Sequence, residues 1–177
     1  TIVRVDGALL PLDEFSILTP EHSADLAYQL LGERKNEKIK KKELDFSYGV
    51  TGLGRFRVNL YMQRNCLAMC LRLIPYVIPS IEELGLPELV KDLAMRHSGL
   101  FLVTGAVGSG KSTTLASMIE YVNINKTSHI VTIEDPIEYV HKHNKATIDQ
   151  REVGTDTLSF AEALKRVFRQ DPNIILV

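Results

Sequence analysis

The chain lacks an excess of charge of either sign. Among its 177 residues, 21 are lysine or arginine and 22 are aspartate or glutamate, so the formal net charge is −1. Proteins that attract nucleic acid or anionic lipid through their overall charge carry a clear positive surplus. We therefore expect no nucleic-acid partner. The hydrophobic content of 45% and the charged content of 24% are ordinary for a soluble globular protein.

Long apolar runs are also missing. No stretch approaches the roughly 20 residues that a helix needs to cross a bilayer, and no signal peptide opens the chain. We therefore expect a cytoplasmic protein with no direct membrane insertion. The sequence starts at Thr1 inside one strand-like stretch and stops at Val177 inside another, so we expect a fragment of a longer chain.

Cysteine is scarce and histidine is scattered. Cys66 and Cys70 form no CxxC pair, and the five histidines show no metal-ligand spacing, with His141-x-His143 the nearest approach to one. A zinc site and a disulfide framework are therefore not expected. Buried free thiols in a reducing compartment are the better interpretation of the two cysteines.

A glycine-rich motif is the most informative feature that the chain does contain. Residues Gly105 to Ser112 fit G-x-x-x-x-G-K-[ST] at every fixed position. The apolar run before them predicts a buried strand over 100–104, and apolar residues at helical spacing after them predict a helix over 111–122. Strand, glycine turn and helix form the context in which this motif binds the phosphates of a nucleotide.

The chemistry of this phosphate loop follows from its residue types. Glycines let consecutive backbone N–H groups approach phosphate oxygens at the positive end of the helix dipole. Lys111 is expected to reach the β- and γ-phosphates, and the Ser112 hydroxyl to ligate Mg²⁺. Thr113 is expected near the α-phosphate, although a plain helix-start role explains it nearly as well. The predicted nucleotide contacts are Gly105, Ala106, Val107, Gly108, Ser109, Gly110, Lys111, Ser112 and Thr113.

Two domains are expected on either side of a linker. Residues 1–74 have the pattern of a small α+β unit, in which Thr19-Pro20 begins a helix that Gly32 ends. Residues 75–86 are the expected linker. Residues 87–177 alternate strands and helices, which predicts an α/β domain with parallel pairing. Its other elements are a helix over 87–96, a strand over 129–134, a short strand near 146–149, a helix near 159–169 and a strand over 174–177.

Three carboxylates follow the strand over 129–134. Because parallel α/β folds bind ligands at the carboxyl ends of their strands, Glu134 or Asp135 is a candidate for Mg²⁺ or for the attacking water. A polar loop whose acids only cap the next segment is an equally good explanation of the spacing. Glu138 is the weaker candidate, because it lies four residues beyond the strand.

Two arginines share one face of a strand in the first domain. Arg55 and Arg57 alternate with apolar residues, and their guanidinium groups are candidates for contacting nucleotide on a neighbouring subunit. On spacing alone a solvated strand face is favoured. Arg64 is a weaker candidate of the same kind.

Several motifs in order resemble the retraction ATPases of type IV pili, the PilT/PilU branch of the type II/IV secretion ATPase superfamily. The resemblance covers nearly the whole chain, and its motifs are far more specific as an ordered set than singly. They are the phosphate loop, Arg55-Phe-Arg-Val-Asn59, Ile78-Pro-Ser-Ile-Glu-Glu-Leu-Gly85, Thr132-Ile-Glu-Asp-Pro-Ile-Glu138, Gln150-Arg-Glu-Val-Gly154 and Arg169-Gln-Asp-Pro172.

The resemblance implies a PAS-like N-terminal domain, the first part of a RecA-like domain, and a hexameric ring with ATP and Mg²⁺ between subunits. It implies a cytoplasmic motor that pulls on an inner-membrane pilus platform protein. It makes Glu134, Asp135 and Glu138 the family's aspartate box, with Glu134 toward the metal. It likewise makes Arg55, Arg57 and Arg64 the arginines that act across subunits.

The chain departs from the family pattern in two places. Ala106-Val107 replaces the usual Pro-Thr, which should preserve binding because these positions act through backbone N–H groups. The sequence stops at Val177, where the family continues into a Walker B segment with a catalytic glutamate and later a histidine box. We therefore expect these 177 residues to bind ATP but to hydrolyse it poorly.

Three alternatives remain open at this stage. One is a pilus-assembly or type II secretion ATPase of the same superfamily, although the zinc-binding cysteines typical of those proteins are not seen. A GTPase is disfavoured, because Asn125-Lys126-Thr127-Ser128 lacks the aspartate of an NKxD base-reading motif. The third is an accessory nucleotide-binding subunit like PilU.

Overall fold

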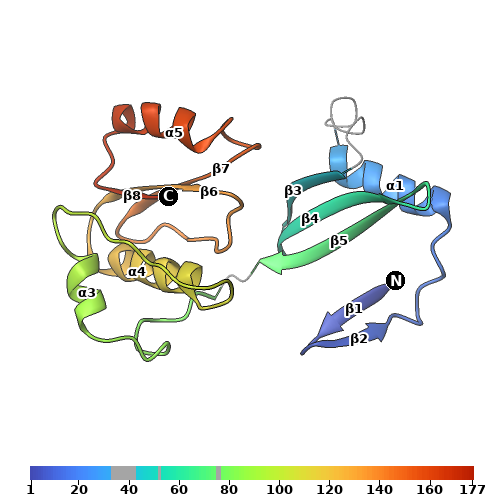
Figure 1. The fold of residues 1–177 in the computed structure, drawn as a ribbon, viewed down its shortest axis with the longest axis horizontal. Coiled ribbons are helices and arrows are strands. Elements are labelled where there is room, and N and C mark those ends of the chain that lie inside the picture. Colours follow the sequence, from blue (N-terminus) through green and yellow to red (C-terminus); the bar gives the residue numbers. More distant parts are fainter. Residues whose placement is uncertain (33–42, 52, 75–76) are drawn as a thin grey trace. The chain divides into compact units, whose positions relative to one another are not determined.

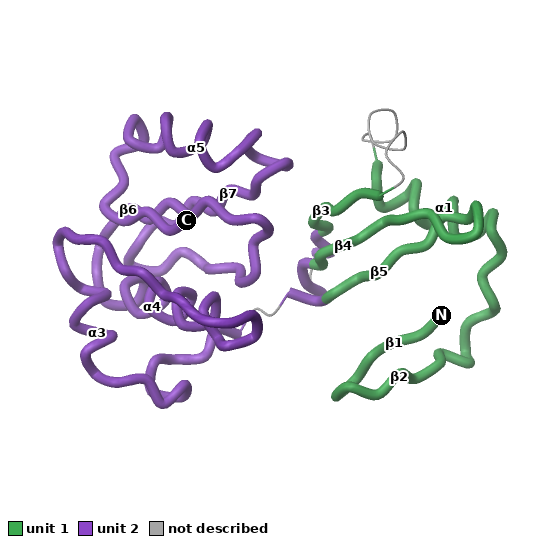
Figure 2. The backbone as a smooth tube through the Cα atoms, viewed as in Figure 1, with its two compact units in different colours: residues 1–48, 56–72 green, residues 49–55, 73–177 purple. Residues whose placement is uncertain are grey.

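The computed structural model describes residues 1–32, 43–51, 53–74 and 77–177. Residues 33–42, Gly52 and the first two residues of the expected linker, Pro75 and Tyr76, lie outside these ranges. The described chain divides into two compact units, residues 1–48 with 56–72 and residues 49–55 with 73–177 (Figure 2).

Helix α1 of the first unit spans Pro20–Leu31. The hydroxyl of Thr19 accepts a hydrogen bond from the N–H of His22 at 3.2 Å, and Pro20 stands in the first turn, where a missing N–H costs nothing. Gly32 closes the helix with φ of +53°. The helix and both of its end signals are therefore as predicted.

The rest of the first unit is made of strands. β1 (Ile2–Val5) and β2 (Ala8–Pro11) form an antiparallel hairpin, and β3 (Glu43–Val50), β4 (Gly54–Gln63) and β5 (Cys66–Ile74) form a three-stranded sheet (Figure 1). The apolar side of α1 and this sheet share a small core. Its buried members are Ala27, Leu31, Phe46, Val58 and Leu60.

The structure corrects the expected burial of both cysteines. Cys66 is half-buried and Cys70 is exposed. Alternate residues of a strand point to opposite faces, and on β5 the face that packs on the core is that of Leu67 and Met69. Cys70 therefore lies on the other face.

The second unit is built on a parallel sheet. β6 (His129–Glu134) lies between β7 (Thr147–Glu152) and β8 (Ile174–Leu176), and both pairings are parallel. Helices α3 (Leu89–Ala94) and α4 (Lys111–Asn125) precede β6 in the chain, and α5 (Phe160–Val167), extended by a short 3-10 turn, η2 (Phe168–Gln170), connects β7 to β8 (Figure 1). The predicted α/β class with parallel pairing is confirmed.

Helix α4 packs through its apolar side onto this sheet. Ile119 and Val122 of α4 meet Ile130 of β6 and Ile148 of β7, each at most 6% exposed. This packing holds the C-terminal half of α4 against the beginning of β6 and β7. Within the described ranges, none of the helices combines the length and apolarity needed to cross a membrane.

The strand predicted over 100–104 is absent. Residues 99–105 carry no regular secondary structure, and Leu100 and Leu102 are 85% and 72% exposed. A short apolar run is typical of a buried strand, but a strand also needs a hydrogen-bonded neighbour. Among the described strands none pairs with this segment. The prediction rested on the side-chain pattern and was wrong about the backbone.

Candidate functional site

The phosphate loop joins residue 104 to α4 in a backbone path that depends on glycine. Gly108 and Gly110 have φ of +78° and +87°, in the left-handed region that other residues rarely adopt. A Cβ atom at Gly105 would lie 2.7 Å from the Ser109 hydroxyl oxygen. The glycines of this loop are thus required for separate reasons, conformation at Gly108 and Gly110 and close approach at Gly105.

The N-terminus of α4 is left without a protein cap. Gly110 occupies the cap position and offers no side chain, and the first turn contains no acidic residue. The backbone N–H groups of Lys111, Ser112 and Thr113 have no acceptor within the part of the chain that the structure describes. Three free N–H groups at the positive end of a helix dipole fit a phosphate group.

The Lys111 side chain curls over this loop. Its ammonium donates to the carbonyl oxygens of Gly105 and Ala106 at 3.1 and 2.7 Å. The charge is therefore held above the loop by backbone acceptors, at the place from which it can balance a bound anion.

The predicted carboxylates reach the same cavity as Ser112. A cavity of about 180 Å³ is lined by Ser112 and Leu115 of α4 on one side and by Glu134, Asp135 and Glu138 on the other. Glu134 is half-buried at the end of β6, whereas Asp135 and Glu138 are exposed. The structure thus brings together the residues that were expected to hold Mg²⁺ and orient water.

A hydrogen-bond network fixes Glu134. Its carboxylate accepts from the Thr132 hydroxyl at 2.6 Å, from the Gln150 side-chain amide at 3.1 Å and from the N–H of Glu138 at 3.5 Å. The parallel register places Thr132 of β6 beside Gln150 of β7, so the pairing of the two strands brings the amide to the carboxylate. Glu134 is therefore oriented by its neighbours.

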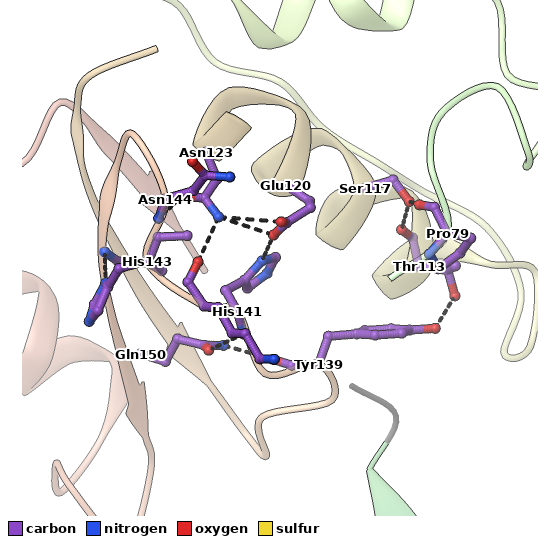
Figure 3. Close-up of polar contacts among 12 residues, drawn as sticks. Pro79, Thr113, Ser117, Glu120, Asn123, Tyr139, His141, His143, Asn144 and Gln150 are labelled. Carbon is purple, nitrogen blue, oxygen red and sulfur yellow. Dashed lines mark hydrogen bonds and ion pairs between the residues drawn. The ribbon is translucent and has the colours of Figure 1, made fainter. Parts of the chain in front are cut away.

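The acidic loop, residues 134–146 from the end of β6 to the start of β7, is tied to α4 by side chains (Figure 3). Among them, the sequence did not single out Tyr139, Glu120 or Asn123. The hydroxyls of Tyr139 and Thr113 lie 2.9 Å apart, and His141 Nδ1 lies 2.8 Å from a Glu120 carboxylate oxygen. Asn123, fully buried, donates to the carbonyl of Lys142 and accepts from the N–H of Asn144.

Glu152 is a second residue that the sequence reading missed. It is 3% exposed at the end of β7, where it accepts from the N–H of Ile137 in the acidic loop at 3.3 Å and from the Thr155 hydroxyl at 3.2 Å. It had appeared only inside the Gln150–Gly154 motif. The sequence did contain a signal for it, because Gln150, Glu152 and Gly154 place an amide, a carboxylate and a glycine together at the end of one predicted strand.

The three predicted arginines lie on β4 and in the turn before β5. Arg55 lies 3.6 Å from Glu152 and is 31% exposed, Arg57 is exposed on β4, and Arg64 is exposed in the turn before β5 with φ of +48°. The carboxylate partner of Arg55 belongs to its own chain. A role for these arginines across subunits stays a prediction.

The donor set fits magnesium bound together with phosphates. Among the described residues, no three histidine, cysteine or acidic side chains converge as a metal-binding cluster. Mg²⁺ is commonly held by one or two protein oxygens and completed by phosphate and water. Ser112 and Glu134, which face one cavity, could supply those protein oxygens.

Comparison with known proteins also supports the interpretation of this site as a nucleotide site. The family model described as type II/IV secretion system protein matches residues 51–177. The type IV pilus ATPase PilU of Pseudomonas aeruginosa is 44% identical over 176 residues, 99% of this chain and 46% of that protein. The type IV pilus retraction ATPase PilT of the same organism is also 44% identical, over 99% of this chain and 51% of that protein.

The fold agrees with the sequence. A crystal structure of the pilus retraction motor PilT with bound ADP matches with a TM-score of 0.92 and 51% identity, over 98% of this chain and 51% of that one. The chain therefore spans about half the length of the relatives that it matches. The resemblance predicted from the ordered motifs is confirmed.

Proposed function

Because the chain belongs to the type II/IV secretion system protein family, we propose that it is part of an ATP-hydrolysing motor that retracts type IV pili. One observation carries the proposal. The uncapped N-terminus of α4, with its free N–H groups and Lys111, lies beside a cavity whose other wall carries three carboxylates. Phosphoryl transfer from a nucleotide needs these two halves, an anion cradle and groups that hold metal and water.

Each residue of this site has an assigned part. The amides from Gly108 to Thr113 hold the phosphates, and Lys111 balances charge on the β- and γ-phosphates. Ser112 and Glu134 would hold Mg²⁺, which when bound neutralises charge that develops on the phosphates. Asp135 and Glu138, both exposed to the cavity, would orient the attacking water.

The remaining groups come from neighbouring copies in this proposal. A homo-hexameric ring would bring Arg55, Arg57 and Arg64 of one subunit to nucleotide on the next, where an arginine stabilises transition-state charge. The exposure of Arg57 and Arg64 is compatible with such a role. Like the motors it resembles, the ring would stand in the cytoplasm against the inner-membrane pilus platform protein. The 177 residues alone would bind ATP and turn it over slowly.

An accessory subunit is the second candidate. The chain is 44% identical to PilU and 44% identical to PilT over nearly its whole length, so identity does not choose between them. In this second candidate the protein binds ATP without hydrolysing it and does not retract pili without a partner motor. It would differ in the first respect from PilU, which is described as an ATPase. Pilus-assembly and secretion ATPases are more distant alternatives.

The test uses the full-length protein that contains this chain. ATPase activity is measured against protein concentration for wild type and for Arg55→Ala, with Lys111→Ala as the inactive reference. A ring with shared sites predicts a cooperative rise with concentration and a loss of about 10³-fold in Arg55→Ala. Activity that is independent of concentration and indifferent to Arg55 would remove the shared-site claim. No hydrolysis by wild type, with ATP bound, would favour the accessory subunit.

A further inference from the structure

The acidic loop contacts α4 along one face of the helix. Thr113, Glu120 and Asn123 are spaced i, i+7 and i+10, which puts the three on one side of an α-helix. They bond to Tyr139, to His141 and to the backbone at Lys142 and Asn144 (Figure 3). The loop that carries the carboxylates is therefore attached to the same helix whose first turn forms the phosphate cradle.

The contact nearest to the nucleotide site is between two hydroxyl groups. Tyr139 Oη and Thr113 Oγ1 are 2.9 Å apart and partly buried. A phenol is the more acidic of the two hydroxyls, so Tyr139 is the better donor. When Tyr139 donates a hydrogen bond to Thr113 Oγ1, the hydroxyl hydrogen of Thr113 is available to bond to another acceptor. Thr113 belongs to the uncapped turn, where that acceptor would be a phosphate oxygen.

The backbone of the same tyrosine is linked to Glu134. The side-chain amide of Gln150 donates both to the Tyr139 carbonyl at 2.8 Å and to a Glu134 carboxylate oxygen at 3.1 Å. Its own oxygen accepts from the N–H of His141 at 2.8 Å. Tyr139 thus lies between a residue of the phosphate cradle and the amide that orients Glu134.

We propose that Tyr139 is a positioning residue of the nucleotide site: its hydroxyl orients the Thr113 hydroxyl toward phosphate and couples nucleotide binding to the placement of the acidic loop. The proposal rests on the function proposed above. It assigns no chemical step to Tyr139, whose hydroxyl acts on nucleotide only through Thr113. It applies to the triphosphate tail and is independent of the base.

The experiment is a double-mutant cycle in the full-length protein. Tyr139→Phe keeps the ring and removes the hydroxyl, and Thr113→Val keeps the shape and removes the other hydroxyl. The dissociation constant of ATP with Mg²⁺, kcat and KM are measured for wild type, both single variants and the double variant. Tyr139→Phe is expected to raise the dissociation constant and KM by about 2- to 10-fold, the effect of one hydrogen bond. In the Thr113→Val background the same change should have no further effect.

Tyr121→Phe is the matched control. Tyr121, on α4, is also half-buried, but its hydroxyl forms no hydrogen bond with the described residues. It should leave nucleotide affinity unchanged, and thermal melting of both variants verifies that they fold. Equal affinity of Tyr139→Phe and wild type would overturn the inference, as would a Tyr139→Phe effect of the same size with and without the Thr113 hydroxyl. Failure of the wild type to bind ATP would instead overturn the proposed function, and the inference with it.

Discussion

The two walls of the candidate site are held in place by different means. The phosphate loop depends on its backbone, since its glycines take conformations that other residues rarely adopt and its free N–H groups are the proposed phosphate ligands. The acidic loop depends on side chains, since Thr132, Gln150 and Asn123 fix it through hydrogen bonds from other elements. We expect the phosphate loop to tolerate substitution at most of its non-glycine positions, because the backbone makes its contacts. In the acidic loop each substitution should also disturb the neighbouring residues that bond to the changed side chain.

The largest effect is expected where the phosphate loop does use a side chain. Lys111→Ala removes the one ammonium that lies on the carbonyls of Gly105 and Ala106. ATP turnover of the full-length protein should fall by about 10²- to 10³-fold, the cost of losing one preorganised electrostatic contact. Steady-state phosphate release measures it. Turnover within a few-fold of wild type would show that backbone amides suffice.

The next effect concerns the anchor of the acidic loop. Asn123 is fully buried, and its amide bonds with the backbone of Lys142 and Asn144. Asn123→Ala removes this buried amide, so the Lys142 carbonyl loses its bond from Asn123 and the N–H of Asn144 keeps only the 3.3 Å bond to the Ala146 carbonyl. The loss should cost about 1–3 kcal/mol of unfolding free energy. Urea unfolding measures the loss. Asn125→Ala, on the exposed end of the same helix, is the control and should cost under about 1 kcal/mol. Equal losses would mean that the loop is not anchored through Asn123.

A smaller, pH-dependent effect is expected at the opposite end of β6. His129 Nε2 lies 2.9 Å from Asp149, and this hydrogen bond raises the pKa of His129 above its ordinary value of 6.5. A raised folded-state pKa adds stability that is complete below about 6.5 and is lost as pH rises through the folded value. Because the Asp149 side chain is 55% exposed, the contribution should stay under about 1 kcal/mol.

The comparison of Asp149→Asn with wild type checks this prediction. Unfolding free energy measured from pH 5 to pH 9 should decline with pH in the wild type and decline less in the variant. ATP affinity should be alike in the two proteins at each pH, because His129 begins the strand whose other end carries Glu134. A steeper pH dependence in the variant would contradict the assignment to this pair.

The smallest effect is expected from a side chain of the phosphate loop. Val107 is fully exposed, so Val107→Thr, which restores a residue usual in the family, changes no packing. ATP affinity should stay within about 2-fold of wild type. Isothermal titration measures it. A large gain in affinity would show that the side chain at position 107 contacts the nucleotide in addition to the backbone N–H groups of the loop.

The sequence predicted those parts of the molecule that local chemistry decides. Thr19 caps its helix as predicted, through a bond from the N–H group three residues on, and Ser159 caps α5 in the same way. The phosphate loop was recognisable because its requirements for glycine and lysine fall within eight consecutive positions. Glu134, Asp135 and Glu138 were predicted to lie near the phosphate loop because strand ends meet at one edge of a parallel sheet, and they line the same cavity as Ser112.

Features that depend on distant residues could not be predicted in this way. Tyr139 and Gln150 act through partners 26 and 16 residues away in sequence, and only the register of β6 with β7 brings the second pair together. The segment over 100–104 was assigned to a strand from its side chains, but its conformation depends on a neighbouring strand. Local patterns carry no information about such neighbours.

The segment from Leu100 to Leu102 has a practical consequence at the bench. Its side chains are 85%, 42% and 72% solvent-accessible, and its main chain joins no sheet. Such a stretch is prone to aggregation, because the same stretch of another copy can pair with its backbone and bury the apolar side chains. For these 177 residues prepared alone, light scattering should therefore show aggregation. The average particle mass should rise with protein concentration whether or not ATP is added. A specific ring should instead show one defined particle mass, and ATP should change the fraction of protein that is assembled.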